Sequence, residues 1–117
     1  MLMKSILSYG VAATAYLIAS LPCQAKDLGE WLAEPPKHVL QSQKPLLPLS
    51  HCIGIALSSW GTPIALNGDG LVDVYVPGGG MVLLAIRVID RGSIRVLEIR
   101  SNKAFDDRAK NKIDTCL

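Results

Sequence analysis

The sequence predicts an α+β domain: an antiparallel sheet of three to four strands, with an N-terminal and a C-terminal helix on one face, linked by a disulfide. The first observation is a change of period. Apolar residues recur at helical spacing over residues 48–60, alternate with a period of two from residue 71 to residue 100, and then return to helical spacing. The second observation is that one cysteine falls within each predicted helix. The change of period is typical of a sheet that buries one face under helices, and the two cysteines would link these helices.

Residues 1–25 are predicted to be a secretory signal peptide. Lys4 supplies a positive start, the apolar run is dense over Ile6–Leu21, and no further charge occurs in the segment. It closes on Leu-Pro-Cys-Gln-Ala, a helix breaker followed by small residues where a signal peptidase reads. Cleavage after Ala25 leaves a mature chain that starts at Lys26, and we expect a periplasmic or secreted protein.

Two alternatives for this segment stay open. About 20 apolar residues can span a bilayer, so an uncut segment would anchor the chain, and it is the one membrane contact that we expect. Tyr9 and Tyr16 dilute the run, and Pro22 lies where a cleavage turn belongs, which favours cleavage. The other alternative is a lipoprotein signal with Cys23 as the lipidated residue, although Pro22 stands where a small residue is usual.

The composition of the mature chain limits the class of partner. Of the 117 residues, 92 remain after the 25 of the signal, enough for one domain with a small core. They carry 11 Lys plus Arg against 10 Asp plus Glu. A nucleic-acid binder needs a clustered basic face, so we expect no nucleic-acid partner. Four arginines alternate with apolar residues, as on the solvated side of a hairpin: Arg87, Arg91, Arg95 and Arg100.

Cysteine usage agrees with export. Cys23 lies in the signal, which leaves Cys52 and Cys116, an even number in an oxidising compartment. We expect one disulfide between them, which in the chain-entropy model stabilises the fold by roughly 3–4 kcal/mol. Two free thiols are the alternative. His38 and His51 are the remaining soft ligands and no pair has zinc spacing, so we expect neither a metal site nor a cofactor.

Residues 26–47 are predicted to be a proline-rich lead-in to the domain. Their prolines interrupt any helix or central strand. Trp31 lies in the first apolar cluster and has two interpretations. It is either an anchor for a partner, since buried aromatics often dominate interfaces, or a cap on the edge of the protein's own domain.

The domain itself is predicted over residues 48–117, and it begins with a helix. Pro48 or Ser50 marks the start of this helix, and Gly61 marks its end. Gly54 weakens it by up to about 1 kcal/mol relative to alanine and allows a neighbour to approach closely. The apolar stripe of the helix has three- and four-residue spacing: Leu49, Cys52, Ile53, Ala56, Leu57 and Trp60.

Segments with strand character follow. A short apolar piece at residues 63–66 leads into a glycine-rich turn, and residues 71–76 then alternate valines with polar residues, as in a half-buried strand. Residues 81–89 form the most apolar run and predict a central strand. Asp90-Arg91-Gly92 predicts a tight hairpin turn in which Gly92 is left-handed. The inward residues of the central strand are expected to be Leu84, Ile86 and Val88.

The last strand, residues 94–100, breaks the alternation. Ile94 and Val96 belong to one phase and Leu97 and Ile99 to the other, which predicts a bulge or apolar cover on both faces. A final helix follows, capped by Ser101 or Asn102. Its inner stripe is expected to be Phe105, Ala109, Ile113 and Cys116. The predicted disulfide would therefore join the first helix to the last across one face of the sheet.

No combination of residues predicts catalysis, and we expect no enzyme. Ser50, His51 and Cys52 are contiguous, but neighbours on a helix do not face each other. Asp106 and Asp107 suit the first turn of a helix electrostatically. The glycines at 78–80 lack the lysine and the helix that follow a phosphate-binding loop.

One run of elements in the C-terminal half is informative. A strand at residues 82–89, the Asp-x-Gly turn, a strand at residues 93–99 and a helix that opens Ala-Phe-Asp-Asp-Arg-Ala follow one another, and upstream Cys52 precedes Trp60 and Pro63. This order resembles the C-terminal domain of the TonB/TolA family of envelope energy-transducing proteins, over about half of the mature chain. The resemblance implies an α+β fold and the binding of peptides or envelope proteins by strand addition. It does not imply energy transduction, because a cleaved signal removes the membrane anchor.

We therefore expect an exported envelope protein that binds a protein or peptide partner at a free sheet edge. The last strand is the candidate edge, because its apolar residues occupy both phases. Arg95, Leu97, Ile99 and Trp31 are the candidate partner-binding residues; alternatively, the lead-in covers Leu97 and Ile99. The alternative function is a secreted inhibitor or immunity protein that blocks the active site of another protein.

Overall fold

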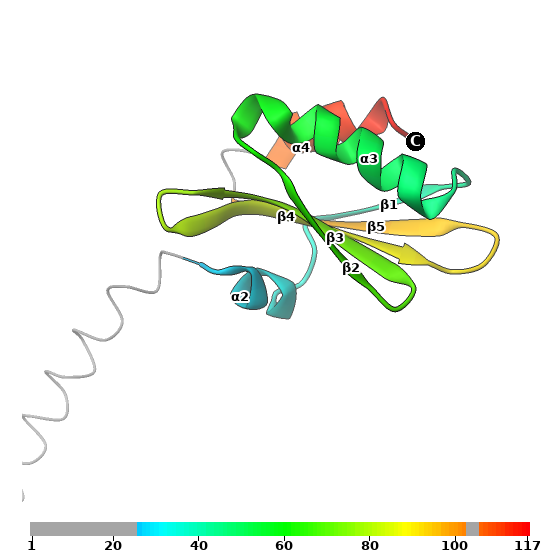
Figure 1. Ribbon diagram of the computed structural model, residues 1–117, viewed down its shortest axis with the longest axis horizontal. Helices are drawn as coiled ribbons and strands as arrows, with labels where there is room; N and C mark the ends of the chain where they lie inside the picture. The colour runs from blue at the N-terminus through cyan, green and yellow to red at the C-terminus, as the bar shows by residue number, and fades with distance from the viewer. Residues whose placement is uncertain (1–25, 103–105) are drawn as a thin grey trace, which may run out of the picture.

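The computed structural model describes residues 26–102 and 106–117, which form an α+β fold with a five-stranded antiparallel sheet (Figure 1). The strand order is β1-β5-β4-β3-β2. The class is the predicted one, but the described sheet has five strands instead of three to four. The strands are β1 (His38–Ser42), β2 (Ile64–Gly68), β3 (Leu71–Gly78), β4 (Met81–Asp90) and β5 (Arg95–Ser101).

The helices lie on both faces of the sheet. Figure 1 shows α3 (Leu46–Leu57) and α4 (Asp106–Asp114) together on one face, as predicted for the first and last helices of the domain. A 3-10 turn over Ser58–Trp60 extends α3. Helix α2 (Leu28–Ala33), which the sequence did not predict, lies on the opposite face.

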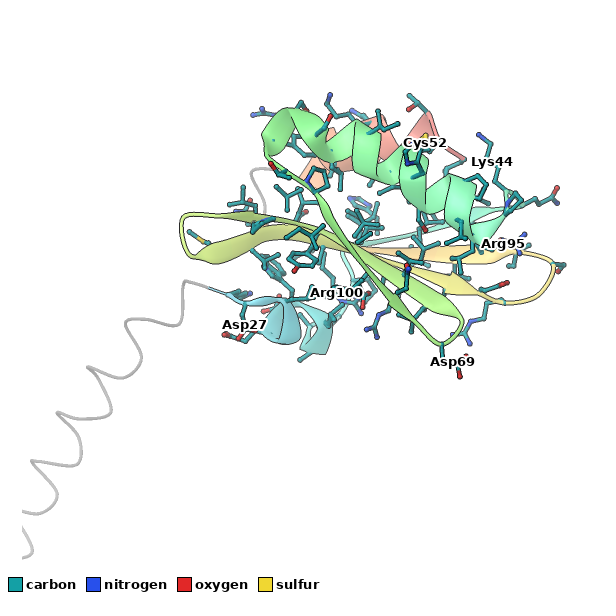
Figure 2. The ribbon with its side chains drawn as sticks, viewed as in Figure 1. Asp27, Lys44, Cys52, Asp69, Arg95 and Arg100 are labelled. Atoms are coloured by element: carbon teal, nitrogen blue, oxygen red, sulfur yellow. A yellow bond between two sulfur atoms is a disulfide. The ribbon has the colours of Figure 1, made fainter. Side chains whose placement is uncertain are left out.

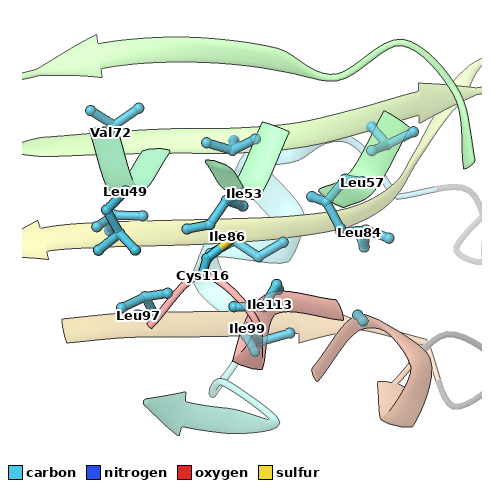
Figure 3. Close-up of a cluster of buried hydrophobic side chains, with 14 residues drawn as sticks. Leu49, Ile53, Leu57, Val72, Leu84, Ile86, Leu97, Ile99, Ile113 and Cys116 are labelled. Atoms are coloured by element: carbon cyan, nitrogen blue, oxygen red, sulfur yellow. The ribbon is translucent and has the colours of Figure 1, made fainter. Parts of the chain in front are cut away.

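One apolar layer holds α3 and α4 against the sheet (Figure 3). Because side chains of a strand alternate between faces, every second residue of β3, β4 and β5 points into this layer. The predicted inward residues of the central strand are all fully buried. The layer consists of Leu49, Ile53, Leu57, Val72, Val74, Val76, Leu84, Ile86, Val88, Leu97, Ile99, Ala109, Ile113 and Cys116.

The predicted disulfide is present. Cys52 in α3 is bonded to Cys116, just after α4, with their Cα atoms 5.8 Å apart. This bond joins the two helices on the same face of the sheet, as the positions of the cysteines on the apolar stripes predicted. The alternative of free thiols is wrong. Ser101 is the last residue of β5. The predicted cap of α4 adjoins residues 103–105, which lie outside the described residues together with the predicted stripe residue Phe105.

The proline-rich segment is part of the sheet domain. It holds α2, β1 and the first two residues of α3. The side chain of Asp27 accepts a hydrogen bond from the backbone of Glu30 at 2.8 Å and caps α2. Strand β1 pairs with β5 so that Leu40 lies opposite Leu97. This segment therefore supplies the additional strand and the additional helix.

Strand β5 is an interior strand, so the expectation that it is a sheet edge is wrong. It pairs with β1 on one side and with β4 on the other. No register shift interrupts its pairing with β4, so the predicted bulge is absent there; the irregularity in the described ladders lies between Val76 and Pro77 of β3. The broken alternation reflects two different faces: Leu97 and Ile99 are buried beneath α3 and α4, whereas Val96 lies half-buried on the other face, outside the apolar cluster around Trp31.

The predicted signal, residues 1–25, lies outside the described residues. Lys26, which follows the predicted cleavage point, is fixed to the domain: its carbonyl accepts a hydrogen bond from the backbone of Val82 at 2.8 Å. Within residues 26–102 and 106–117, none of the helices has the length and apolar character needed to cross a bilayer.

Candidate functional site

The residues of β5 that the sequence marked for partner binding are buried. Leu97 and Ile99 are fully buried beneath the helices. The guanidinium of Arg95 donates to the carbonyls of Gln43 and Gly92, both at 2.9 Å. It therefore ties the β4–β5 turn, where Gly92 has the predicted positive φ, to the loop that follows β1 (Figure 2). None of these three side chains forms part of an open surface.

Trp31 belongs to the domain's own core. Only 5% of it is exposed, and its indole N–H donates to the carbonyl of Val82 at 2.7 Å. It packs against Val82 and Ala85 on the face of the sheet opposite α3, and Lys26 lies over its ring at 4.5 Å. This position agrees with the interpretation of Trp31 as a cap.

The described sheet has two edges, and they differ in protection. Strand β1 is followed by Lys44 and Pro45 and preceded by Pro36 and Lys37, and charges and prolines of this kind discourage edge pairing. Strand β2 contains no charge and no proline, and all five of its residues are exposed. An exposed, uncharged edge presents backbone N–H and C=O groups to another chain. Strand β2 is therefore the open edge.

A groove runs between β2 and α3. Helix α3 covers the inner strands, and the apolar layer that it forms with α4 and the sheet contains no residue of β2 (Figure 3). The groove left at the side has a volume of about 410 Å³, within the range of ligand-binding clefts. Val72 and Val74 line it from β3, and no Lys, Arg, Asp or Glu does. The groove is thus an uncharged, largely apolar site beside an open strand.

The helical side of the groove is a row of residues four apart: Leu47, His51 and Ile55. Residues at this spacing lie one above the other on a helix. Leu47 and Ile55 are 65% and 61% exposed, among the most exposed large apolar residues of the described chain. Gly54 also lines the groove, and a Cβ atom built on it meets nothing within 4 Å. The wall therefore presents two exposed apolar side chains, one on each side of His51, and has open space at Gly54.

The hydroxyl groups of the groove are engaged within α3 and the turn that follows it. Ser50 donates to the carbonyl of Leu46 at 2.7 Å, and Ser58 donates to the carbonyl of Ile55 at 2.6 Å. Both hydroxyls donate to backbone carbonyls, so neither donates to His51 as a nucleophile donates to its general base. The lining suits the binding of apolar side chains.

Charged residues gather on the opposite face of the sheet. Arg87 makes two hydrogen bonds to the carboxylate of Asp73, at 2.8 and 2.9 Å, and this hydrogen bonding raises the pKa of Arg87. Arg100 pairs with Glu98 at 3.1 Å and donates to the carbonyl of Glu34 at 2.8 Å. These arginines pair within the domain. In the described part of the chain, no cluster of three His, Cys, Asp or Glu side chains has metal-binding geometry.

The sequence alone did not predict this groove as a site. The signal for them was the position of Leu47 and Ile55, two large apolar residues that lie outside the predicted inner stripe of the first helix. The second signal was the absence of charge from residues 63–68. No protein-family model, no curated protein and no solved structure matches this chain.

Proposed function

We propose that this protein is a binding module that accepts an extended segment of a partner protein or peptide as an additional strand along β2. One observation carries the proposal: the exposed, uncharged edge strand β2 borders an apolar groove whose other wall is α3. In strand addition, the backbone hydrogen bonds give affinity and pockets for alternate side chains give specificity. The edge and the groove offer these two components side by side.

The proposal includes a location in the cell envelope and a relationship to the C-terminal domain of the TonB/TolA family. The Cys52–Cys116 disulfide supports an oxidising compartment. The β4–β5 hairpin with its Asp-x-Gly turn, followed by α4, supports the relationship. Cell fractionation and the intact mass of the recovered protein test the location. We expect a periplasmic or secreted chain that starts at Lys26, and a cytoplasmic chain that retains residues 1–25 would contradict export.

A pair of proline substitutions on the two edges tests strand addition. Ala65→Pro removes a backbone N–H from β2, and Gln41→Pro removes one from β1. Proline is tolerated on an edge strand where its nitrogen faces solvent. We expect the Ala65→Pro chain, immobilised and exposed to envelope extract, to lose partners that the wild type and Gln41→Pro retain. Circular dichroism verifies folding, and equal recovery by all three chains would contradict the proposal.

A further inference from the structure

We infer that the segment bound along β2 carries two aliphatic residues separated by one residue, and that both aliphatic side chains enter the groove beside α3. This inference rests on the proposed function and specifies the class of partner. It follows from the direction of the backbone groups of β2, from the spacing of the groove wall and from the chemistry of the lining.

The hydrogen-bond pattern identifies which residues of β2 face the open edge. Asp90 donates its backbone N–H to the carbonyl of Gly70 at 2.9 Å, so the even-numbered residues of β3 bond to β4. Bonding groups alternate along an antiparallel strand, and the odd-numbered residues of β3 therefore bond to β2. Ala65 and Asn67 lie opposite even-numbered residues of β3. Their N–H and C=O groups consequently point away from the sheet, towards an added strand.

The same two residues set the direction of the partner's side chains. Ala65 and Asn67 lie on the face of the sheet that carries α3, because they are opposite Val74 and Val72 of the core. In an antiparallel ladder, directly opposed residues place their side chains on one face. Two partner residues that bond to Ala65 and Asn67 therefore point into the groove, and the residue between them points to the other face.

The spacing of the groove wall matches this arrangement. Groove-facing residues of a strand are about 6.7 Å apart, two residues at about 3.3–3.4 Å each. The row of Leu47, His51 and Ile55 on α3 repeats every four residues, which is about 6 Å along a helix. Helix α3 runs along the strands (Figure 3). Two side chains at strand spacing thus fit the two intervals between three side chains of the helix.

The lining determines the chemistry of these two side chains. A charged group in the groove would lose water without meeting a Lys, Arg, Asp or Glu, which is unfavourable. Aliphatic groups cover Leu47 and Ile55 and occupy the space beside Gly54. A second copy of this chain suits the site poorly, because its own β2 would direct only Ala65 and Asn67 into the groove. The occupant is therefore a partner strand with an aliphatic pair.

Two fluorescein-labelled peptides of equal composition test the inference against the full chain. One has Val-Thr-Val at its centre and the other Val-Val-Thr, and both have the same flanks of serine, threonine and lysine. Only the first directs both valines into the groove. We expect it to bind at least about fivefold more tightly by fluorescence polarisation, since burial of each apolar group adds affinity.

Two variants separate this inference from the proposed function. Gly54→Leu fills the groove at a position with open space, so the chain keeps its fold, and we expect the two peptides to bind it equally and weakly. Ala65→Pro should abolish binding of both peptides.

Equal binding of the two peptides by the wild type, abolished by Ala65→Pro, would overturn the aliphatic pair and leave strand addition intact. Peptide binding that Ala65→Pro does not affect would overturn strand addition itself. No binding of either peptide by the wild type would overturn the inference, and sedimentation of the free chain as a dimer would assign the edge to a second copy.

Discussion

The indole N–H of Trp31 donates a 2.7 Å hydrogen bond to the carbonyl of Val82, 51 residues further along the chain. Lys26 accepts a hydrogen bond from the N–H of the same residue. Both backbone groups of Val82, near the start of β4, are thus bound by the segment that contains α2. This contact fixes α2 on the sheet face opposite α3 and α4, and it covers Val82 and Ala85.

Substitution of Trp31 should reduce stability and leave partner binding at β2 unchanged. We expect Trp31→Ala to lower the free energy of unfolding by about 3–5 kcal/mol, the usual effect of removing a large buried aromatic side chain. Trp31→Phe keeps most of the packing and should cost about 1–2 kcal/mol through the lost hydrogen bond. Urea unfolding measures both. Val39→Ala, at an exposed position on β1, is the control and should change stability by less than about 0.5 kcal/mol.

The disulfide should contribute a large share of the stability. Cys52 and Cys116 close a loop of sequence separation 64. We expect the double variant Cys52→Ala/Cys116→Ala to unfold with a free energy lower by about 2–5 kcal/mol, because the unfolded chain gains freedom. Denaturant unfolding of the wild type with and without reductant gives the same comparison. A reductant effect of similar size in the double variant would show that the loss has another origin.

The pair of Arg87 and Asp73 should stabilise the sheet equally at neutral and alkaline pH. The folded state raises the pKa of Arg87 through its hydrogen bonds to Asp73. A raised pKa of a basic group means that its stabilisation is complete below the unfolded-state pKa and is lost only as the pH rises through the folded-state pKa. Both values lie far above neutrality for arginine, so no loss from Arg87 is expected between about pH 7 and about pH 10.

A double-mutant cycle with Asp73→Asn and Arg87→Gln measures this pair. We expect a coupling free energy of about 1 kcal/mol, because the arginine is partly exposed and solvent screens the pair. The coupling should be the same at the two pH values. A coupling that decreases between them would contradict the assignment of the stabilisation to an arginine that keeps its proton.

The elements that the sequence predicted are those with a strong local pattern. The stripe of α3, the alternation of β3 and the apolar run of β4 each follow from residues close together in the chain. The cysteine pairing also followed, because the expected removal of the signal with Cys23 leaves only Cys52 and Cys116 to pair. These features depend little on what the rest of the chain does.

The elements that were missed depend on distant contacts. Strand β1 has five residues between prolines, and it is a strand because β5, more than 50 residues later, supplies its hydrogen bonds. Once β1 pairs on that side, β5 becomes interior: Leu97 and Ile99 are buried beneath the helices, and Val96 lies half-buried on the other face. The same pattern had suggested an edge. The candidate site was missed for a similar reason, because the openness of β2 depends on where α3 lies across the sheet.

Gly54 is where stability and the proposed binding separate. Alanine is favoured over glycine in a helix by up to about 1 kcal/mol, and the added Cβ meets nothing within 4 Å. We therefore expect Gly54→Ala to raise the free energy of unfolding, measured in urea, by about 0.5–1 kcal/mol.

The single methyl group of Gly54→Ala should weaken binding of the Val-Thr-Val peptide only slightly. Gly54→Leu has a similar helix propensity, but it should weaken binding at least about tenfold because its side chain occupies the groove. Equal stability gains with unequal binding would show that the glycine keeps the groove open at the expense of the helix. A loss of stability in Gly54→Ala would instead mean that this turn of α3 packs more closely than its open surroundings indicate.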